Sequence, residues 1–283
     1  MTGTTTIALG SAVTLGTTDA SGTKWRIGQD GFTGWGSPDS SIEIIPKPRQ
    51  AGAWAGDAFD RERIMLISGT ITALTPTLLN TAIDLLKATV STAPFVMTVT
   101  ESGRARFVYA RRQMATRTPK VTNRHAQFFV QLVAPDPRQF SAAVSGSTTE
   151  FATSGGLTVP FTAPFTIAST IAAGLVTLTN SGNEVGPVTA RIDGPCRGPI
   201  ITHVGSGAPQ VFSLTGLNLV AGESLAIDME KKTVLANGTA SRSGSVTSRV
   251  WSGFDPGINT WAFTAVTPDA SALLTITANP ANK

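Results

Sequence analysis

The segment RIMLISGTITALTPTLLNTAIDLLKAT, residues 63–89, decides the fold class of the first half of the chain. Its first part, 63–74, alternates between apolar and other side chains with the period of a β-strand. Its second part, 75–89, changes to helical spacing, and Thr75 and Pro76 suit the N-cap and the first helical position. We therefore predict a strand followed by a helix. The apolar face predicted for this helix consists of Leu78, Leu79, Ala82, Ile83, Leu85 and Leu86.

The segments after this helix predict more strands. Residues 94–114, PFVMTVTESGRARFVYARRQM, contain two alternating runs on either side of Glu-Ser-Gly, which is a hairpin signal. Residues 128–140, FFVQLVAPDPRQF, alternate and then meet two prolines, which cannot donate hydrogen bonds within a central sheet. The order strand, helix, hairpin, strand predicts an α+β domain over residues 1–140.

The second half of the chain predicts a different architecture. Residues 141–156, SAAVSGSTTEFATSGG, are small and polar, as in a linker, so we place the domain boundary near residue 141. Residues 157–283 contain many short alternating runs, separated by turn residues, without helical spacing. This pattern predicts an antiparallel β-sandwich of the galectin or carbohydrate-module type, and a β-rich protein overall. The runs are LVTLTN, VTARIDGP, PIITHVG, QVFSLTG, SLAIDM, KTVLANG, NTWAFTAV and ALLTITA.

The composition agrees with this organisation. The 283 residues suffice for two domains, and only 14% are charged, against about 25% in a typical globular chain. Much of the surface must therefore consist of Thr, Ser, Gly and Ala, and β-branched Thr favours strands. The single Cys196 cannot form an internal disulfide, and His125 and His203 lack a metal-ligand spacing. We predict no metal site and no cofactor.

The formal net charge of +4 is unevenly distributed. Residues 1–140 contain 15 Lys and Arg against 10 Asp and Glu, whereas residues 141–283 contain 7 against 8. The two halves should therefore face different partners. The first twenty residues lack the basic start of a secretory signal, and no apolar run approaches the length of about 18 residues that spans a bilayer. We expect no membrane insertion.

A basic block occupies residues 102–124 and contains no acidic residue. These side chains could neutralise phosphate, pair with carboxylates across a subunit interface, or face solvent. The block lacks a named nucleic-acid motif, so we favour the interface or the solvent. The arginines that cluster on the predicted hairpin are Arg104, Arg106, Arg111 and Arg112.

Two segments could carry catalysis, and neither does so convincingly. The charged stretch NLVAGESLAIDMEKKTVLANG, residues 218–238, could hold a catalytic acid pair, but alternation of the flanking residues places Glu230, Lys231 and Lys232 in a hairpin turn and points Asp228 away from the core. A glycosidase would need two carboxylates about 5–10 Å apart across a cleft, and nothing here supplies the cleft. Cys196 lies between turn residues with no histidine nearby in sequence. We expect no enzyme and no catalytic residue.

An aromatic segment, VWSGFDPGINTWAF at residues 250–263, allows two interpretations. Trp251 and Trp261 could form an exposed platform that stacks on sugar rings. Alternatively, they plug the sandwich core, which we favour because large aromatic side chains are buried on average.

Several of these segments, taken in order, resemble the siphophage distal tail protein family. RIMLISGTITAL, the helix after it and FVQLVAPDPRQF look like the N-terminal domain, in which a strand ending in Asp-Pro leads into the second domain. LTNSGNEVGPVTARIDGP, LTGLNLVAGESLAIDMEKKTVLANG, the Pro-Gly-Ile-Asn turn and the last strands are similar to the C-terminal domain. The matching segments all follow residue 60.

The resemblance implies a structural role in a phage virion. It implies a hexameric ring that joins the tail tube to the tail tip or baseplate, with the first domain forming the ring and the second projecting outward. The implied partners are other copies of the chain, the tail tube protein, the tape measure protein and the tail-tip or baseplate hub protein, with DNA only in transit. The implied location is the virion tail, after assembly in the host cytoplasm.

Residue roles follow as expectations. We expect Arg104, Arg106, Arg111 and Arg112 to make ring or lumen contacts. Asp136 and Arg138 should fix the geometry with which the chain leaves the first domain. The alternative function is a carbohydrate-binding or host-adhesion module that contacts a host-surface glycan through Trp251 and Trp261.

Overall fold

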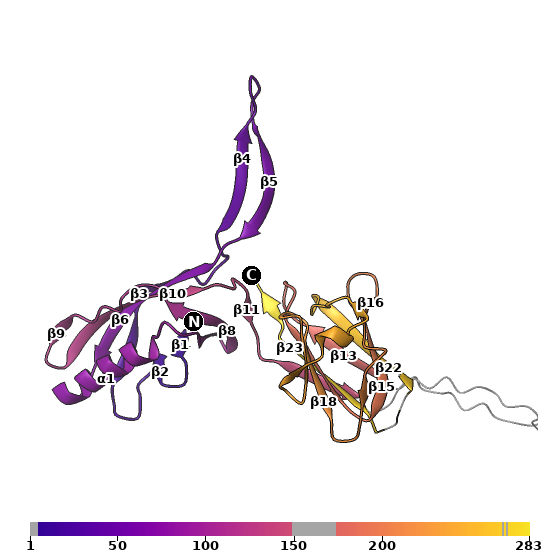
Figure 1. The fold of residues 1–283 in the computed structure, drawn as a ribbon. Helices are drawn as coiled ribbons and strands as arrows, with labels where there is room; N and C mark the ends of the chain where they lie inside the picture. The colour runs from indigo at the N-terminus through magenta and orange to yellow at the C-terminus, as the bar shows by residue number, and fades with distance from the viewer. Residues whose placement is uncertain (1–4, 149–173, 268, 270) are drawn as a thin grey trace, which may run out of the picture. The chain divides into compact units, whose positions relative to one another are not determined.

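The structure is a computed structural model that describes residues 5–148, 174–267, 269 and 271–283 (Figure 1). The chain divides into two compact units, Met1–Ser141 with Lys283 and Ala142–Asn282. Each unit has its own buried hydrophobic core. Strands dominate both units, and the described residues contain one α-helix. The prediction of a β-rich protein with an α+β first part is confirmed.

The sheet of unit 1 runs in the order β2-β1-β7-β8-β10-β6-β3, with β9 beside β10 and β11 beside β8. β10 meets β8 only at Arg111 and Arg112, so the two halves of the sheet diverge on either side of this short contact. Side chains from both halves pack into one core. The elements are β1 (Thr6–Leu9), β2 (Val13–Leu15), β3 (Lys24–Thr33), β4 (Ser40–Pro46), β5 (Ala53–Asp60), β6 (Arg63–Thr72), α1 (Pro76–Thr89), β7 (Phe95–Glu101), β8 (Arg104–Arg112), β9 (Lys120–Thr122), β10 (His125–Ala134) and β11 (Gln139–Phe140).

Helix α1 forms where its sequence predicts it. The Thr75 hydroxyl accepts a hydrogen bond from the Leu78 amide at 3.2 Å, and Pro76 opens the helix. The buried side chains are Leu79, Ala82, Ile83 and Leu86. Leu85 was expected on this face but is 39% exposed, because it lies at the edge of the stripe that contacts the core. The apolar face is therefore narrower than predicted.

The hairpin predicted within residues 94–114 is confirmed as β7 and β8. Glu101 pairs with Arg104, which leaves Ser102 and Gly103 as a two-residue loop. Both have positive φ, +50° and +82°, as a type I′ turn requires. The turn fixes the register, so Met97, Val99, Val108 and Ala110 all face the core.

Unit 2 is an antiparallel β-sandwich, as predicted. One sheet has the order β12-β23-β14-β18-β19-β20, and the other has the order β13-β22-β15-β16-β21 with β17 beside β15. Their inward-facing side chains form the second core. The elements are β12 (Val144–Thr148), β13 (Leu175–Asn180), β14 (Val188–Asp193), β15 (Cys196–Val204), β16 (Gln210–Ser213), β17 (Asn218–Leu219), β18 (Ser224–Asp228), β19 (Thr233–Ala236), β20 (Ala240–Ser241), the short 3₁₀ helix η1 (Ser243–Ser245), β21 (Ser248–Arg249), β22 (Gly257–Thr267), β23 (Leu273–Ala278) and β24 (Ala281–Asn282).

The segment predicted as a linker, 141–156, is partly a strand. Residues 144–148 form β12 and pair with β23 from Val144↔Ala278 to Thr148↔Leu274. Small and polar residues form this strand because its position at the sheet edge demands little burial. Residues 149–156 lie outside the described residues, as do 157–173 at the start of the predicted second domain.

Candidate functional site

The most exposed element of unit 1 is the hairpin β4–β5, which extends away from the rest of the unit (Figure 1). It begins at Ser40, ends at Asp60 and pairs Ile45 with Trp54 near its tip. Every residue of both strands is exposed. A two-stranded hairpin is at best marginally stable by itself in water, because it has no core to bury. We therefore expect this hairpin to pack against the surface of another protein or another copy of the chain.

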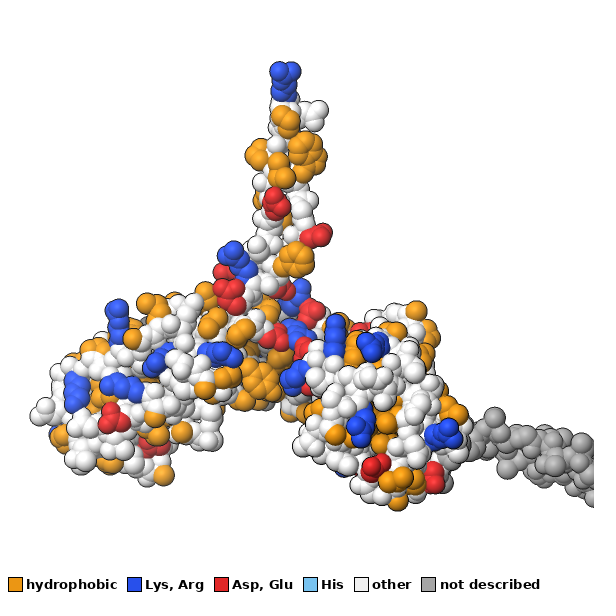
Figure 2. All heavy atoms as spheres, in the orientation of Figure 1, with side chains coloured by type: hydrophobic (Ala, Val, Ile, Leu, Met, Phe, Trp, Pro, Cys, Tyr) orange, Lys and Arg blue, Asp and Glu red, His pale blue; other side chains and the backbone are white. Residues whose placement is uncertain are grey.

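The exposed side chains of this hairpin include large apolar groups. Figure 2 shows them along its length, with cationic side chains at its tip. Lys47 and Arg49 belong to the loop that joins the strands, while Glu43 and Asp57 lie within the strands. A concentration of exposed apolar surface on one element is typical of a protein-binding surface. The apolar side chains and their exposed fractions are Ile42 44%, Ile44 61%, Ile45 52%, Trp54 55% and Phe59 68%.

A buried arginine holds the chain just before this hairpin. Arg63 is 1% exposed and donates to the carbonyl oxygens of Trp35 at 2.9 Å and Pro137 at 2.8 Å. It also donates to the carbonyl oxygens of Gly34 and Gly36. Burial, with the nearby positive charge of Arg106, lowers the pKa of Arg63. These backbone acceptors satisfy the buried cation and fix residues 34–36 at the base of the hairpin.

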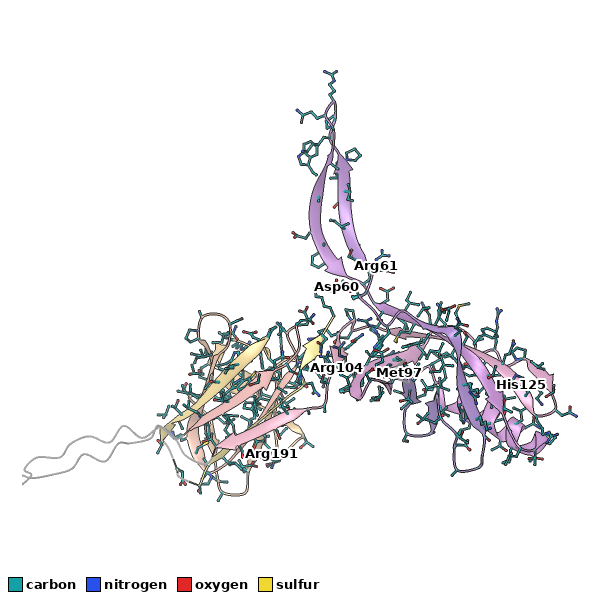
Figure 3. The ribbon with its side chains drawn as sticks, turned by 180° about the vertical axis from the view of Figure 1, so that it is seen from behind. Asp60, Arg61, Met97, Arg104, His125 and Arg191 are labelled. Atoms are coloured by element: carbon teal, nitrogen blue, oxygen red, sulfur yellow. The ribbon has the colours of Figure 1, made fainter. Side chains whose placement is uncertain are left out.

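Two further features hold the same segment. The Gln139 side chain donates to the Trp35 carbonyl at 2.5 Å, and the Trp35 ring lies 6.0 Å from that of Phe32. Gly34 has φ +83°, and a Cβ at this position would collide with the Ile64 carbonyl. Only glycine fits there, because it tolerates both the positive φ and the close backbone approach. These contacts hold residues 34–36, which precede the hairpin, against β6 and Gln139. Asp60 and Arg61 lie at the other side of the base of the hairpin (Figure 3).

A groove of about 730 Å³ crosses the outer face of the β3, β6 and β10 strands. Its apolar wall includes Leu66, Met114 and Phe129, which are 50%, 53% and 45% exposed. Asp30 and Arg117 are its charged lining residues. The groove adjoins an irregular part of β3, where the pairing with β6 shifts between Ile27 and Phe32. Unit 1 thus carries a protruding apolar element and an apolar depression.

The four predicted arginines do not form one surface. Arg104, Arg106 and Arg112 alternate on β8 with the phase of the buried core residues, whereas Arg111 lies on the opposite face. Arg106 is half-buried and donates to the Gln139 side chain at 2.7 Å, and burial together with the charge of Arg104 lowers its pKa. Arg104 is exposed at the end of the strand, opposite Glu101 (Figure 3). Their roles in ring or lumen contacts stay a prediction.

The structure brings Asp136 and Arg138 together. The Arg138 Nη2 lies 2.6 Å from Asp136 Oδ2, and the Arg138 amide donates to the same carboxylate at 3.0 Å. The guanidinium also lies 5.3 Å from the centre of the Phe140 ring. These contacts stiffen the end of unit 1, and their role in directing the chain outward stays a prediction.

The proposed glycan platform is not formed by both tryptophans. Trp261 is fully buried in the sandwich core and stacks on His203 at 4.8 Å, so it cannot contact a sugar. Trp251 is half-buried and packs on Phe212 with the ring centres 4.9 Å apart. Burial of Trp261, the interpretation favoured because large aromatic side chains are buried on average, is confirmed.

The residues considered for catalysis do not come together in one site. Glu230 lies in the turn between β18 and β19, and Asp228 accepts from the Lys231 amide and ammonium at 2.9 and 2.8 Å. Cys196 is buried, which raises the pKa of its thiol to about 11. Within the described ranges, no three His, Cys, Asp or Glu residues gather as metal ligands would. No helix in the described part of the chain is long and apolar enough to cross a membrane.

Comparison with solved structures relates this fold to phage tail proteins. The crystal structure of SPP1 Dit, described as a paradigm of the hub adsorption apparatus in phages that infect Gram-positive bacteria, matches with a TM-score of 0.62 and 11% identity over 90% of this chain and 93% of that one. A chain of the phage P2 baseplate in its activated conformation with Ca matches with a TM-score of 0.54 and 10% identity over 98% of both chains. The same baseplate with Sr gives a TM-score of 0.50 and 9% identity over 96% of this chain and 97% of that one. No protein-family model matches the sequence, and no curated protein matches it significantly.

These matches cover nearly the whole of each chain, so both units take part in the similarity. At this level of identity they establish a shared fold. The protein has the fold of phage Dit hub and baseplate proteins, as the sequence resemblance predicted.

Proposed function

We propose that this protein is a structural component of a tailed-phage virion: a distal tail protein that forms a ring joining the tail tube to the tail tip or baseplate. The observation that carries the proposal is the exposed hairpin β4–β5, which has apolar side chains and no core of its own. The full-length fold similarity to SPP1 Dit supports it. The mechanism is assembly, and no catalytic step is required.

The hairpin provides apolar surface that favours association. Five large apolar side chains are exposed on it, and fully burying one such side chain contributes about 1.5–3 kcal/mol. Because these side chains are 44–68% exposed, burying the rest of them contributes roughly 4–8 kcal/mol, against an association cost of about 4–15 kcal/mol. A single contact of this kind is therefore weak. In a closed ring, however, each copy makes two such contacts, so breaking one does not release a subunit.

The groove of unit 1 is the acceptor that suits the hairpin. We place the hairpin of one copy in the groove of the next, where apolar side chains meet Leu66, Met114 and Phe129. Glu43 on the hairpin and Arg117 in the groove supply opposite charges. Because the donor and acceptor surfaces differ, the contact is heterologous, and a heterologous contact closes a ring when the rotation between copies permits it.

The remaining partners follow from the same proposal. Six copies form the ring, with the tail tube protein, the tape measure protein and the tail-tip or baseplate hub protein as neighbours. DNA passes through the ring only in transit, and Arg104, Arg106, Arg111 and Arg112 are the candidates for ring or lumen contacts. The protein assembles in the host cytoplasm and resides in the virion tail.

The test is the native mass of the purified full-length chain, measured by light scattering across a concentration range. We expect one discrete closed oligomer. Ile44→Asp should dissociate it, because the substitution places a charge within the apolar surface of the hairpin. Ile258→Asp is the matched control, since Ile258 in β22 is likewise an exposed strand isoleucine, 70% exposed against 61% for Ile44.

Each outcome is informative. A wild-type chain that stays monomeric at every concentration contradicts ring formation through its own surfaces. An oligomer that survives Ile44→Asp shows that the hairpin is not the contact. A ring lost equally in Ile258→Asp shows that the effect of Ile44→Asp is not specific to the hairpin.

A further inference from the structure

The outer face of one sheet of unit 2 contains a second groove, of about 430 Å³. It lies over β14, β18, β19 and β23, whose alternate residues Ala190, Ile227, Val234 and Ile276 are buried in the sandwich core. The residues that alternate with these on each strand therefore point away from that core and into the groove. Those with outward-facing side chains are Thr189, Arg191, Ala226, Asp228, Lys231, Thr233, Leu235, Thr275 and Thr277.

The strand register arranges these side chains in rows across the sheet. One row places Thr277 beside Thr189, then Asp228, then Thr233. Adjacent strands lie about 4.8 Å apart, so short polar groups repeat at that interval along the row. Within the described structure, the hydroxyls of Thr233 and Thr277 donate to no protein group. They remain available to a ligand.

A second row contains two apolar side chains and a cationic one. Thr275 lies next to Arg191, followed by Ala226 and Leu235. The small Ala226 side chain leaves space at the centre of the groove. Arg191, marked in Figure 3, is 59% exposed and donates through Nε and Nη2 to Asp193 at 2.6–3.0 Å. Its Nη1 group has no acceptor among the described residues.

Both cationic side chains of the groove are paired with carboxylates. Arg191 pairs with Asp193, and Lys231 pairs with Asp228 at 2.8 Å. Residues 141–283 carry no excess of positive charge, with 7 basic against 8 acidic residues. Binding of a polyanion depends on uncompensated cations, which this surface lacks. A ligand without net charge fits it better.

We propose that this groove binds a neutral glycan. Sugar hydroxyls both donate and accept, so they can satisfy the threonine hydroxyls and the free guanidinium N–H, while sugar C–H groups cover Ala226, Leu235 and the threonine methyl groups. An apolar partner would desolvate these polar groups without replacing their hydrogen bonds. A peptide strand could not add to the sheet here, because β14, β18 and β23 are paired on both sides.

This glycan site differs from the one expected at Trp251 and Trp261. Neither Trp251 nor Trp261 lines the groove. Its volume falls within the range of about 300–1,000 Å³ that is common for ligand sites. An open groove without an aromatic platform should bind weakly per copy. Several copies in one assembly would raise the avidity by about 10²–10⁴.

The experiment measures binding of the full-length protein to an array of neutral and anionic bacterial polysaccharides. Its variants are Thr275→Val with Thr277→Val, and separately Ala226→Leu, which fills the groove. Valine preserves the branched shape, so the strand should be retained. The matched control is Thr177→Val with Thr260→Val, a pair on the other sheet whose hydroxyls lie 3.3 Å apart. Native mass and urea midpoint verify that each variant keeps its assembly and fold.

We expect binding to neutral polysaccharides, a loss of about fivefold or more for the groove threonine variant, and no change for the control. Ala226→Leu should abolish the signal. Three results would overturn the proposal: no neutral polysaccharide binds, only anionic ones bind and Arg191→Gln removes that binding, or neutral binding persists in both groove variants. Ring assembly is measured separately, so either proposal can fail without the other.

Discussion

Arg63→Met should destabilise unit 1 strongly although the substituted side chain is apolar. Arg63 is the most deeply buried cation of the unit, and it donates to carbonyl oxygens of Gly34, Trp35, Gly36 and Pro137. Each buried carbonyl left without a donor costs about 1–3 kcal/mol. Two effects reduce this loss. Methionine has no charge, so the cost of burying the guanidinium disappears, and some of the carbonyl groups will bind water when the loop relaxes. We expect a net loss of about 3 kcal/mol.

The assay is amide hydrogen exchange of the intact chain, followed on β6 and β10. Because about 1.4 kcal/mol corresponds to a tenfold change in an equilibrium constant, the loss should accelerate exchange by about a hundredfold. Arg61→Met is the control: Arg61 is exposed two residues away, and such surface changes usually stay within about 0.5 kcal/mol. Arg63→Lys should not restore protection from exchange. The planar guanidinium donates in two directions, to residues 34–36 and to Pro137, and a single ammonium group cannot reproduce this geometry.

Two results would refute this reasoning. Exchange in Arg63→Met that is accelerated less than about threefold would show that the carbonyls find other donors at little cost. Full protection in Arg63→Lys would show that charge matters and fork geometry does not. If the reasoning holds, Arg63→Met should also weaken oligomer formation, because residues 34–36 anchor the base of the hairpin.

Three further predictions concern single side chains. Thr75→Ala should lower the stability of unit 1 by about 1 kcal/mol through loss of the N-cap, with Thr75→Ser restoring most of it; an unchanged urea midpoint would contradict this. Burial raises the pKa of Asp19, but hydrogen bonds from Ser21, Trp25 and Thr23 outweigh it and lower the pKa overall. The resulting stabilisation is present above the ordinary Asp pKa and is lost as pH falls through the folded-state pKa, so Asp19→Asn should flatten the acid side of a plot of urea midpoint against pH. Burial, with the charge of Asp269, raises the pKa of Cys196 to about 11, so Ellman's reagent should modify it at neutral pH only after unfolding; rapid modification of the folded chain would contradict this.

Elements that bury one face were predictable, because burial leaves a period in the sequence. Helix α1 follows from its N-cap and spacing, and the β7–β8 hairpin follows from two alternating runs around Ser102 and Gly103. Leu85 was expected to be buried but is partly exposed, because helical periodicity shows which side of a helix is apolar but not how much of that side contacts the core. The strand within the predicted linker was missed because an edge strand of Ser, Gly and Thr has the composition of a loop.

The hairpin β4–β5 was missed for the opposite reason. Both of its faces are exposed, so no core selects a period, and SSIEIIP contains neighbouring isoleucines on opposite faces. The available signal was the pair of β-rich runs on either side of KPRQAG, a turn-like stretch with a proline and a glycine. Composition could indicate two strands there, but only the structure shows that they project from the unit.

Arg63 carries a signal that sequence reasoning could have used. It lies in phase with Met65 and Ile67, so strand alternation alone predicts that it faces the core. A charged residue in a buried phase is costly unless many acceptors surround it, and such a residue therefore marks a position where distant segments converge. Here these segments are 34–36 and Pro137, which no local pattern connects to β6.

The same phase argument limits what the arginines of β8 can do. Arg104, Arg106 and Arg112 share the phase of buried Val108 and Ala110, whereas Arg111 points the other way. A ring lumen is a single surface, so one face of β8 cannot present all four guanidinium groups to it. If Arg104 contacts DNA in transit, Arg111 should instead meet a neighbouring subunit or solvent. Four arginines that are close in sequence therefore do not share one surface. Strand alternation separates them into two groups that can be tested independently: Arg104, Arg106 and Arg112 on one face of β8, and Arg111 on the other.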